Sequence, residues 1–120
     1  MDIINEDSIH VISTKISMDE LKKVAEERFG DLVKAVVDVN KMIMAIGGEL
    51  HADEEALLLE RGSSQSDLWG INLYPDSSFP EMIEFDSMIN IRPSQGNRSR
   101  GVEDESIRKS ILEIVRNLIE

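Results

Sequence analysis

The sequence predicts an α+β domain: a mostly antiparallel sheet of about five strands with three helices, in the order βαββαββα. Three observations lead to this prediction. Short runs rich in Val, Ile and Met follow one another in pairs across short turns, as in antiparallel hairpins. Segments with apolar residues at helical spacing separate these pairs. With 120 residues, 41% of them hydrophobic, the chain is expected to form a single domain over 1–120.

The first strand and the first helix are predicted close to the N-terminus. Residues 9–12 (IHVI) are mostly apolar and branched, which favours a strand, whereas the acidic start at 1–8 is expected to be frayed. Ser17 and Glu20 have the spacing of a capping box, in which each side chain bonds the backbone N–H of the other residue. The apolar residues that follow at helical spacing predict a helix over 18–29.

A hairpin and a second helix are predicted in the middle of the chain. Residues 32–39 and 41–46 are dense in Val, Ile and Met, and a tight turn at Asn40-Lys41 is expected to join them. Every residue from 42 to 46 is apolar, which indicates a strand that is central or covered on both faces. Residues 52–61 are helix formers with acids in the first turn, where the helix dipole favours them.

The last third of the chain predicts two strands and a helix. In residues 69–74 apolar and polar positions alternate, as expected for a strand with one buried face. Residues 82–91 alternate over a longer stretch, with Glu84 and Asp86 on the polar face. An apolar stripe beginning near Glu103 predicts a terminal helix, and the helices are expected to pack chiefly on one face of the sheet.

Charge and composition exclude several classes of protein. Thirteen Lys and Arg against 24 Asp and Glu give a formal net charge of −11, which argues against generic binding to nucleic acids or anionic membranes. There is no cysteine, so disulfides, Cys-based metal sites and thiol nucleophiles are excluded. The start lacks the pattern of a signal peptide, and the apolar runs are too short to cross a membrane, so we expect a cytoplasmic protein.

The arginine loop, defined as residues 92–101, is the leading candidate for a binding site. It contains three of the basic residues and no acid, so it is locally positive in an acidic chain. Gly96 and Gly101 have the spacing of a phosphate loop, but the Lys and hydroxyl residue that should follow are absent, which excludes an NTPase. We expect a binding or regulatory domain that receives a small anionic ligand or an acidic partner on Arg92, Asn97, Arg98 and Arg100. The alternative is that the arginines pair with Glu84, Asp86 and Glu103 and pin the loop.

Two further interpretations remain open at the level of sequence. A hydrolytic or metal-dependent enzyme would use His51, Glu84 and Asp86, and His51, Glu54 and Asp86 are weak candidates for metal ligands. The competing interpretation is that His51 helps to cap the second helix; we therefore lean against an enzyme and predict no cofactor. A structural oligomer is the third interpretation, because residues 57–59 are all Leu and exceed one buried helical face, which favours a homodimer.

Four segments resemble a family of small uncharacterised bacterial and archaeal proteins, known as a domain of unknown function. They are Glu27-Arg28-Phe29-Gly30-Asp31, residues 45–55 (AIGGELHADEE), residues 67–75 (DLWGINLYP) and residues 89–99 (INIRPSQGNRS). The resemblance covers nearly the whole chain and includes both the arginine loop and the segment around His51. It implies a single domain in a prokaryotic cytosol, and it implies no activity, cofactor or catalytic residue.

Overall fold

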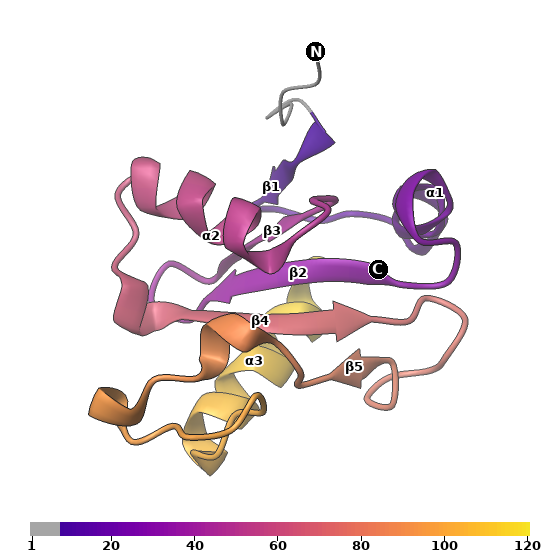
Figure 1. Cartoon of the computed structure of the whole chain (residues 1–120). Coiled ribbons are helices and arrows are strands. Elements are labelled where there is room, and N and C mark those ends of the chain that lie inside the picture. Colours follow the sequence, from indigo (N-terminus) through magenta and orange to yellow (C-terminus); the bar gives the residue numbers. More distant parts are fainter. Residues whose placement is uncertain (1–7) are drawn as a thin grey trace.

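An antiparallel sheet of five strands forms the centre of the computed structural model, which describes residues 8–120 (Figure 1). The strand order is β1-β3-β2-β4-β5, and every neighbouring pair is antiparallel. The strands are β1 (His10–Ile12), β2 (Val33–Asp38), β3 (Ile43–Ile46), β4 (Leu68–Leu73) and β5 (Ile83–Glu84). With three helices, this sheet confirms the predicted α+β class.

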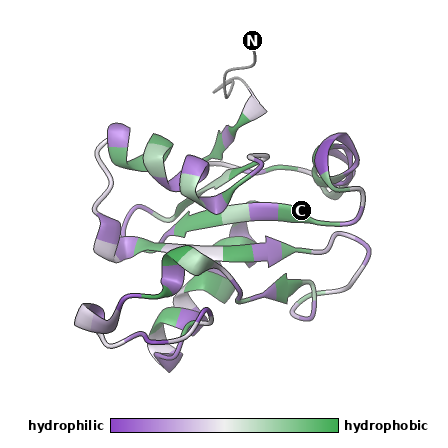
Figure 2. Cartoon of the chain, viewed as in Figure 1, coloured by the Kyte–Doolittle hydropathy of each residue, from purple (hydrophilic) through white to green (hydrophobic). Residues whose placement is uncertain are grey.

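The helices cover both faces of the sheet: α1 (Met18–Arg28) and α3 (Glu105–Leu118) contribute to one core, and α2 (His51–Glu60) to another. Figure 1 shows α2 and α3 on opposite sides of the strands. The larger core contains apolar residues of α1, α3 and the strands, whereas the smaller one joins Leu57 and Leu58 of α2 to Val36 and Ala45. Figure 2 shows mainly apolar residues along β3 and within β2 and β4.

The predicted β2-β3 hairpin is present. In its turn, Asp38 Oδ1 accepts hydrogen bonds of 2.9 Å from the backbone N–H groups of Asn40 and Lys41. In β3, Met44 and Ile46 belong to the larger core and Ala45 to the smaller one. Within the apolar run, residues 43–46 therefore form a strand that is covered on both faces, whereas Met42 lies in the turn and is 64% exposed.

The three helices begin in different ways. Ser17 and Glu20 form the predicted capping box of α1, and Asp104 caps α3 by accepting hydrogen bonds from two backbone N–H groups. The residue before α2 is Leu50, which has no side chain able to cap. The first-turn N–H groups of α2 are therefore left without a side-chain acceptor, and this helix end faces the pocket described below.

The prediction of a strand over 82–91 is wrong beyond its first residues. Only Ile83–Glu84 pairs with β4, and Met88–Asn90 forms a 3₁₀ turn capped by the Ser87 hydroxyl. At the edge of β4, the backbone groups of Gly70 are hydrogen-bonded by the Asn90 side chain. The Asn90 amide donates to the Gly70 carbonyl (2.9 Å) and accepts from the Gly70 N–H (2.8 Å). A side chain thus takes the hydrogen bonds that a longer strand would have made.

Few described residues precede β1. The expected frayed start lies outside the described residues except for Ser8, whose hydroxyl accepts a hydrogen bond from Arg28. The C-terminus lies beside the start of α1. The backbone N–H of Glu120 donates to the Ile16 carbonyl, and the backbone N–H of Ile16 donates to the Leu118 carbonyl.

No helix within 8–120 has the length and apolar character needed to cross a bilayer.

Candidate functional site

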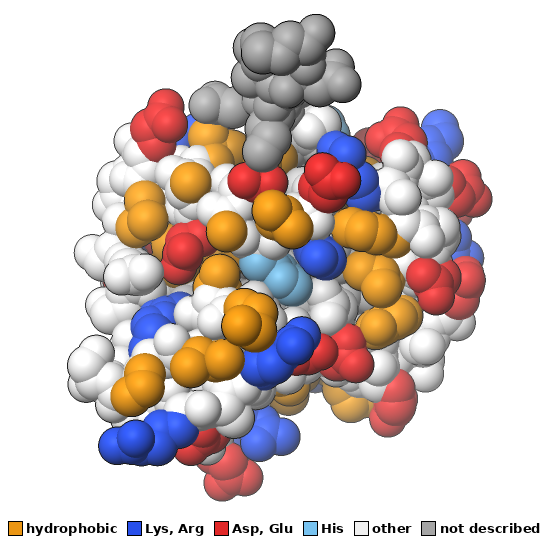
Figure 3. Space-filling model, viewed as in Figure 1, with side chains coloured by type: hydrophobic (Ala, Val, Ile, Leu, Met, Phe, Trp, Pro, Cys, Tyr) orange, Lys and Arg blue, Asp and Glu red, His pale blue; other side chains and the backbone are white. Residues whose placement is uncertain are grey.

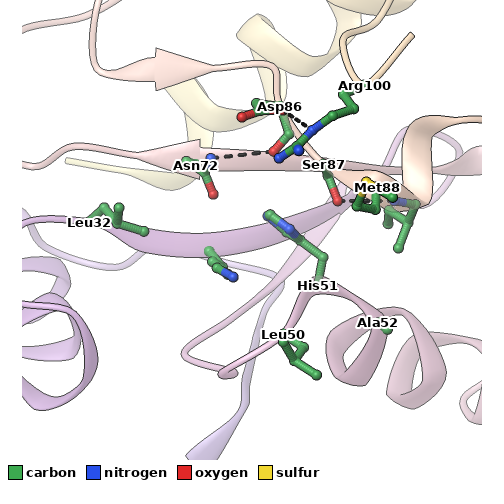
Figure 4. A pocket seen from close by; sticks show the side chains of 11 residues that line it. Leu32, Leu50, His51, Ala52, Asn72, Asp86, Ser87, Met88 and Arg100 are labelled. Atoms are coloured by element: carbon green, nitrogen blue, oxygen red, sulfur yellow. Dashed lines mark hydrogen bonds and ion pairs between the residues drawn. The ribbon is translucent and has the colours of Figure 1, made fainter.

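A pocket of about 300 Å³ opens on the α2 side of the sheet. We call it the α2 pocket; its polar lining residues are Lys34, His51, Asn72, Asp86, Ser87 and Arg100. They come from β2, the start of α2, β4, the segment after β5 and the arginine loop. Figure 3 looks onto this face and shows a histidine surrounded by apolar side chains with cationic ones beside it, and Figure 4 shows the pocket from close by.

His51 reaches from α2 to the sheet. As the first residue of the helix it lies over β4, and its Nε2 is 2.8 Å from the Ile71 carbonyl oxygen. A carbonyl only accepts, so Nε2 carries the hydrogen, and Nδ1 holds the lone pair in the neutral ring. The interpretation of His51 as a helix cap is therefore wrong.

The ionisation of His51 follows from its surroundings. Burial lowers the pKa of His51, and the hydrogen bond to Ile71 opposes this shift. Lys34 and Arg100 lower the same pKa further through their positive charges, while Asp86 raises it. The ring is consequently neutral at pH 7, and all three of those charged groups lie close enough to act on it.

Arg100 and Asp86 form an ion pair at the side of the pocket. Arg100 Nε donates to Asp86 Oδ1 over 2.6 Å, and the two side chains are 56% and 39% exposed. This contact uses one of the five N–H groups of the guanidinium, and within residues 8–120 the side chain has no second hydrogen-bond partner. Arg100 therefore retains donors for an outside acceptor.

Asn72 lies deeper in the pocket, next to that ion pair. Its Nδ2 donates to Glu84 Oε1 (2.9 Å) and to the Asp86 carbonyl (3.3 Å). Both partners are acceptors, which fixes the orientation of the amide. The opposite atom, Oδ1, is buried and has no hydrogen-bond partner among the described residues. Figure 4 shows it turned away from Asp86, toward the side where Leu32 and His51 lie.

Arg92 does not reach the pocket. Its guanidinium stacks 4.4 Å from the centre of the Trp69 ring and donates to the backbone carbonyls of Leu68, Ile89 and Gln65. These carbonyls come from the start of β4, the 3₁₀ turn and the connector before β4. Arg92 thus connects three segments through hydrogen bonds instead of presenting its charge to solvent.

Asn97 and Arg98 also lie away from the pocket. Asn97 is buried, and its amide donates to the carbonyls of Asn90, Ser99 and Gly101 while accepting from Glu103 N–H. The Glu103 carboxylate accepts from the backbone N–H groups of Arg98 and Ser99, and these hydrogen bonds lower the pKa of Glu103. The Arg98 side chain is exposed. The arginine loop is therefore held in place, but hydrogen bonds between side chains and the backbone contribute more to this than the expected ion pairs do.

The residues proposed for an enzyme or a metal site are not all together. His51 and Asp86 line the α2 pocket, whereas Glu84 lies outside it and accepts from Asn72 and from the Tyr74 hydroxyl. Glu54 is fully buried below the Gly48 backbone, whose N–H donates to its Oε2. Within residues 8–120 no three His, Asp or Glu side chains are grouped so that they could hold a metal ion.

Sequence reasoning missed Lys34 and Asn72. The two residues are opposite each other in the β2-β4 register and share the face that α2 leaves open. The available signal was a polar residue inside each strand, Lys34 between Val33 and Ala35 and Asn72 between Ile71 and Leu73. For the homodimer prediction, Leu57 and Leu58 are buried and Leu59 is 38% exposed, so one leucine remains for a partner and the dimer stays a prediction.

The chain belongs to a family without a known activity. Residues 10–118 match the family described as "Protein of unknown function (DUF5674)", which confirms the resemblance to a domain of unknown function. No curated protein matches the chain, and no solved structure matches it. The chemistry of the α2 pocket is therefore the basis from which a function can be inferred.

Proposed function

We propose that this chain is a binding or regulatory domain that takes a small acid into the α2 pocket. One observation carries the proposal: Arg100 and Lys34, two cations from distant parts of the chain, line the same cavity beside a helix start that has no side-chain cap. Asp86 is the single carboxylate among the lining residues, so the formal charge of the pocket is positive although the chain is strongly acidic.

The chemistry of the lining suits an acid. Arg100 offers unused N–H donors in a forked arrangement, and Lys34 adds a second positive charge. The first turn of α2 contributes the positive end of a helix dipole, which the acidic Asp53 in the same turn partly offsets. Burial keeps His51 neutral, so this ring adds polarity without a further charge. Within the arginine loop, the anion-binding role thus falls to Arg100, while Arg92 and Asn97 maintain the fold.

A thermal-shift experiment with simple acids tests this proposal. Acetate, hexanoate and inorganic phosphate serve as probes, because binding to the folded state raises the melting temperature. We expect at least one of them to stabilise the wild type, with the rise lost in Arg100→Ala. Arg98→Ala is the matched control, since it removes an exposed arginine of the same loop that does not line the pocket.

The proposal is contradicted if no probe raises the melting temperature of the wild type. It is also contradicted if Arg100→Ala and Arg98→Ala lose the response equally, because a response that depends on overall charge would then replace a site at Arg100.

A further inference from the structure

We infer that the acid carries a hydrogen-bond donor, N–H or O–H, in addition to its acid group, together with an apolar substituent. This inference rests on the proposed function and specifies the class of ligand. It depends on three features of the α2 pocket that the acid-binding argument does not use: the unpartnered oxygen of Asn72, the bonding of Asn72 and Arg100 to the same residue, Asp86, and the uncovered apolar residues Leu50 and Met88.

The donor requirement comes from Asn72. The residue is only 8% exposed, and its Oδ1 is buried without a partner among the described residues. A buried carbonyl-type oxygen without a hydrogen bond is costly, and native structures satisfy most such atoms. Because Glu84 and Asp86 hold Nδ2 from the other side, the amide cannot turn to relieve Oδ1. A ligand N–H or O–H supplies the missing partner.

Asn72 and Arg100 both bond to Asp86. Its backbone carbonyl accepts from Asn72 at 3.3 Å, and its carboxylate accepts from Arg100 at 2.6 Å. Asn72 and Arg100 are therefore held by the same residue, one on its main chain and the other on its side chain. A single ligand in the α2 pocket can therefore meet Arg100 with its acid group and Asn72 with a donor elsewhere in the same molecule.

The apolar requirement comes from Leu50 and Met88. Both line the pocket, at the start of α2 and in the 3₁₀ turn, and they are 51% and 65% exposed. They offer apolar surface that a ligand substituent would bury. A water molecule occupies about 30 Å³ of liquid, so a cavity of about 300 Å³ takes a ligand with on the order of ten non-hydrogen atoms.

A matched pair of ligands tests the donor requirement without changing the protein. N-acetyl-leucine has an amide N–H next to its carboxylate and an isobutyl group; its ester analogue replaces that N–H by oxygen and keeps the shape. Isothermal titration calorimetry compares their affinities for the wild type. We expect the amide to bind and the ester to bind at least about tenfold more weakly, because the ester leaves Asn72 Oδ1 unpaired.

A third acid and two variants complete the experiment. 4-Methylpentanoate keeps the carboxylate and the apolar group without the amide, and it too should bind more weakly than N-acetyl-leucine. Arg100→Ala should abolish binding of all three acids, and Arg98→Ala should leave their order unchanged.

The outcomes separate the two levels of the argument. If the amide and the ester bind equally and both need Arg100, the donor requirement is overturned while the acid-binding proposal stands. If only 4-methylpentanoate binds, the donor requirement is likewise overturned and the acid-binding proposal stands. If none of the acids binds and the simple acids of the thermal-shift panel also fail, the proposed function and this inference fall together.

Discussion

Arg92 and Arg100 belong to one loop, yet their surroundings give them different roles. Arg92 bonds three backbone carbonyls and stacks on Trp69, whereas Arg100 makes a single ion pair at the side of the pocket. Hydrogen bonds from a charged donor to backbone carbonyls stabilise the folded state, and their loss leaves buried polar groups with fewer partners. The first arginine is therefore a residue of the fold, and the second is available to a ligand.

Arg92→Ala should accordingly destabilise the protein. We expect the free energy of unfolding to fall by about 2 to 4 kcal/mol, from lost hydrogen bonds and lost packing on Trp69. Arg98→Ala should change it by less than about 0.5 kcal/mol, as is usual for an exposed residue. Urea unfolding of the two variants checks this, and equal midpoints would contradict the structural role of Arg92.

Glu54 is the most deeply buried ionisable residue of α2. It is 0% exposed, and burial raises the pKa of Glu54 well above its usual 4.5, against the opposing hydrogen bond from Gly48. Lys34 and Arg28 lower the same pKa, and Asp53 raises it, without reversing the shift. The folded state thus holds a proton that the unfolded chain releases above pH 4.5.

The stability contributed by protonated Glu54 is full below pH 4.5 and is lost as the pH rises toward the folded-state pKa. Glu54→Gln keeps the shape and removes the titration, so this variant should gain stability relative to the wild type with rising pH. Each pH unit should change the ratio between the unfolding constants of the wild type and of Glu54→Gln by up to about tenfold. Urea unfolding at about pH 5, 6 and 7 measures it.

The lowered pKa of His51 acts in the opposite direction, since its contribution is lost as the pH falls below 6.5. It is present in both proteins and cancels in the comparison. A difference between wild type and Glu54→Gln that stays constant with pH would contradict the burial of a protonated carboxyl at this position.

At the scale of elements, the segment after β5 builds one side of the α2 pocket because it leaves the sheet. Gly70 has no side chain, and the 3₁₀ turn lies against it, with Asn90 bonding the Gly70 backbone. A Cβ added at Gly70 would lie 2.5 Å from the Cβ of Ser87, which is buried. The position of Asp86, Ser87 and Met88 around the pocket therefore depends on a glycine in β4.

Gly70→Ala should push this segment away from β4. We expect a loss of about 1 to 3 kcal/mol in the free energy of unfolding, the usual range for overpacking, together with weaker binding of acids. Gly101→Ala is the control, because an added Cβ there meets its nearest atom at 3.5 Å, an ordinary contact. If thermal unfolding gives the same melting temperature for both variants, the close approach at Gly70 does not constrain the segment.

The same segment marks where sequence reasoning failed. Alternation across 82–91 is what an edge strand requires, and its first residues do pair with β4. The pattern does not reveal that the Asn90 side chain takes over the hydrogen bonds of Gly70, because an Asn at a polar position fits an exposed strand face equally well. The capping box at Ser17 was predicted correctly because it is a local interaction over three residues.

At the scale of the whole molecule, the fold class followed from hydrophobic patterning, but the candidate site did not. Patterning reports which residues are buried, and this identified the paired strands and the three helices. The α2 pocket arises from strand register, which places Lys34 opposite Asn72, and from the His51 side chain, which reaches from α2 to the Ile71 carbonyl of β4. A single sequence carries little information about such long-range pairing, and charge clustering drew attention to all three arginines of the loop alike.

Backbone amide NMR during a titration with hexanoate tests the central claim most directly, since it reports where an acid binds on the folded chain. The account predicts saturable shifts that are largest at Ala52, Asn72, Ser87 and Arg100, which line the α2 pocket, and their loss in Arg100→Ala. Shifts centred on Gly96 and Arg98 at the outer part of the loop, or no saturable shift at all, would contradict it.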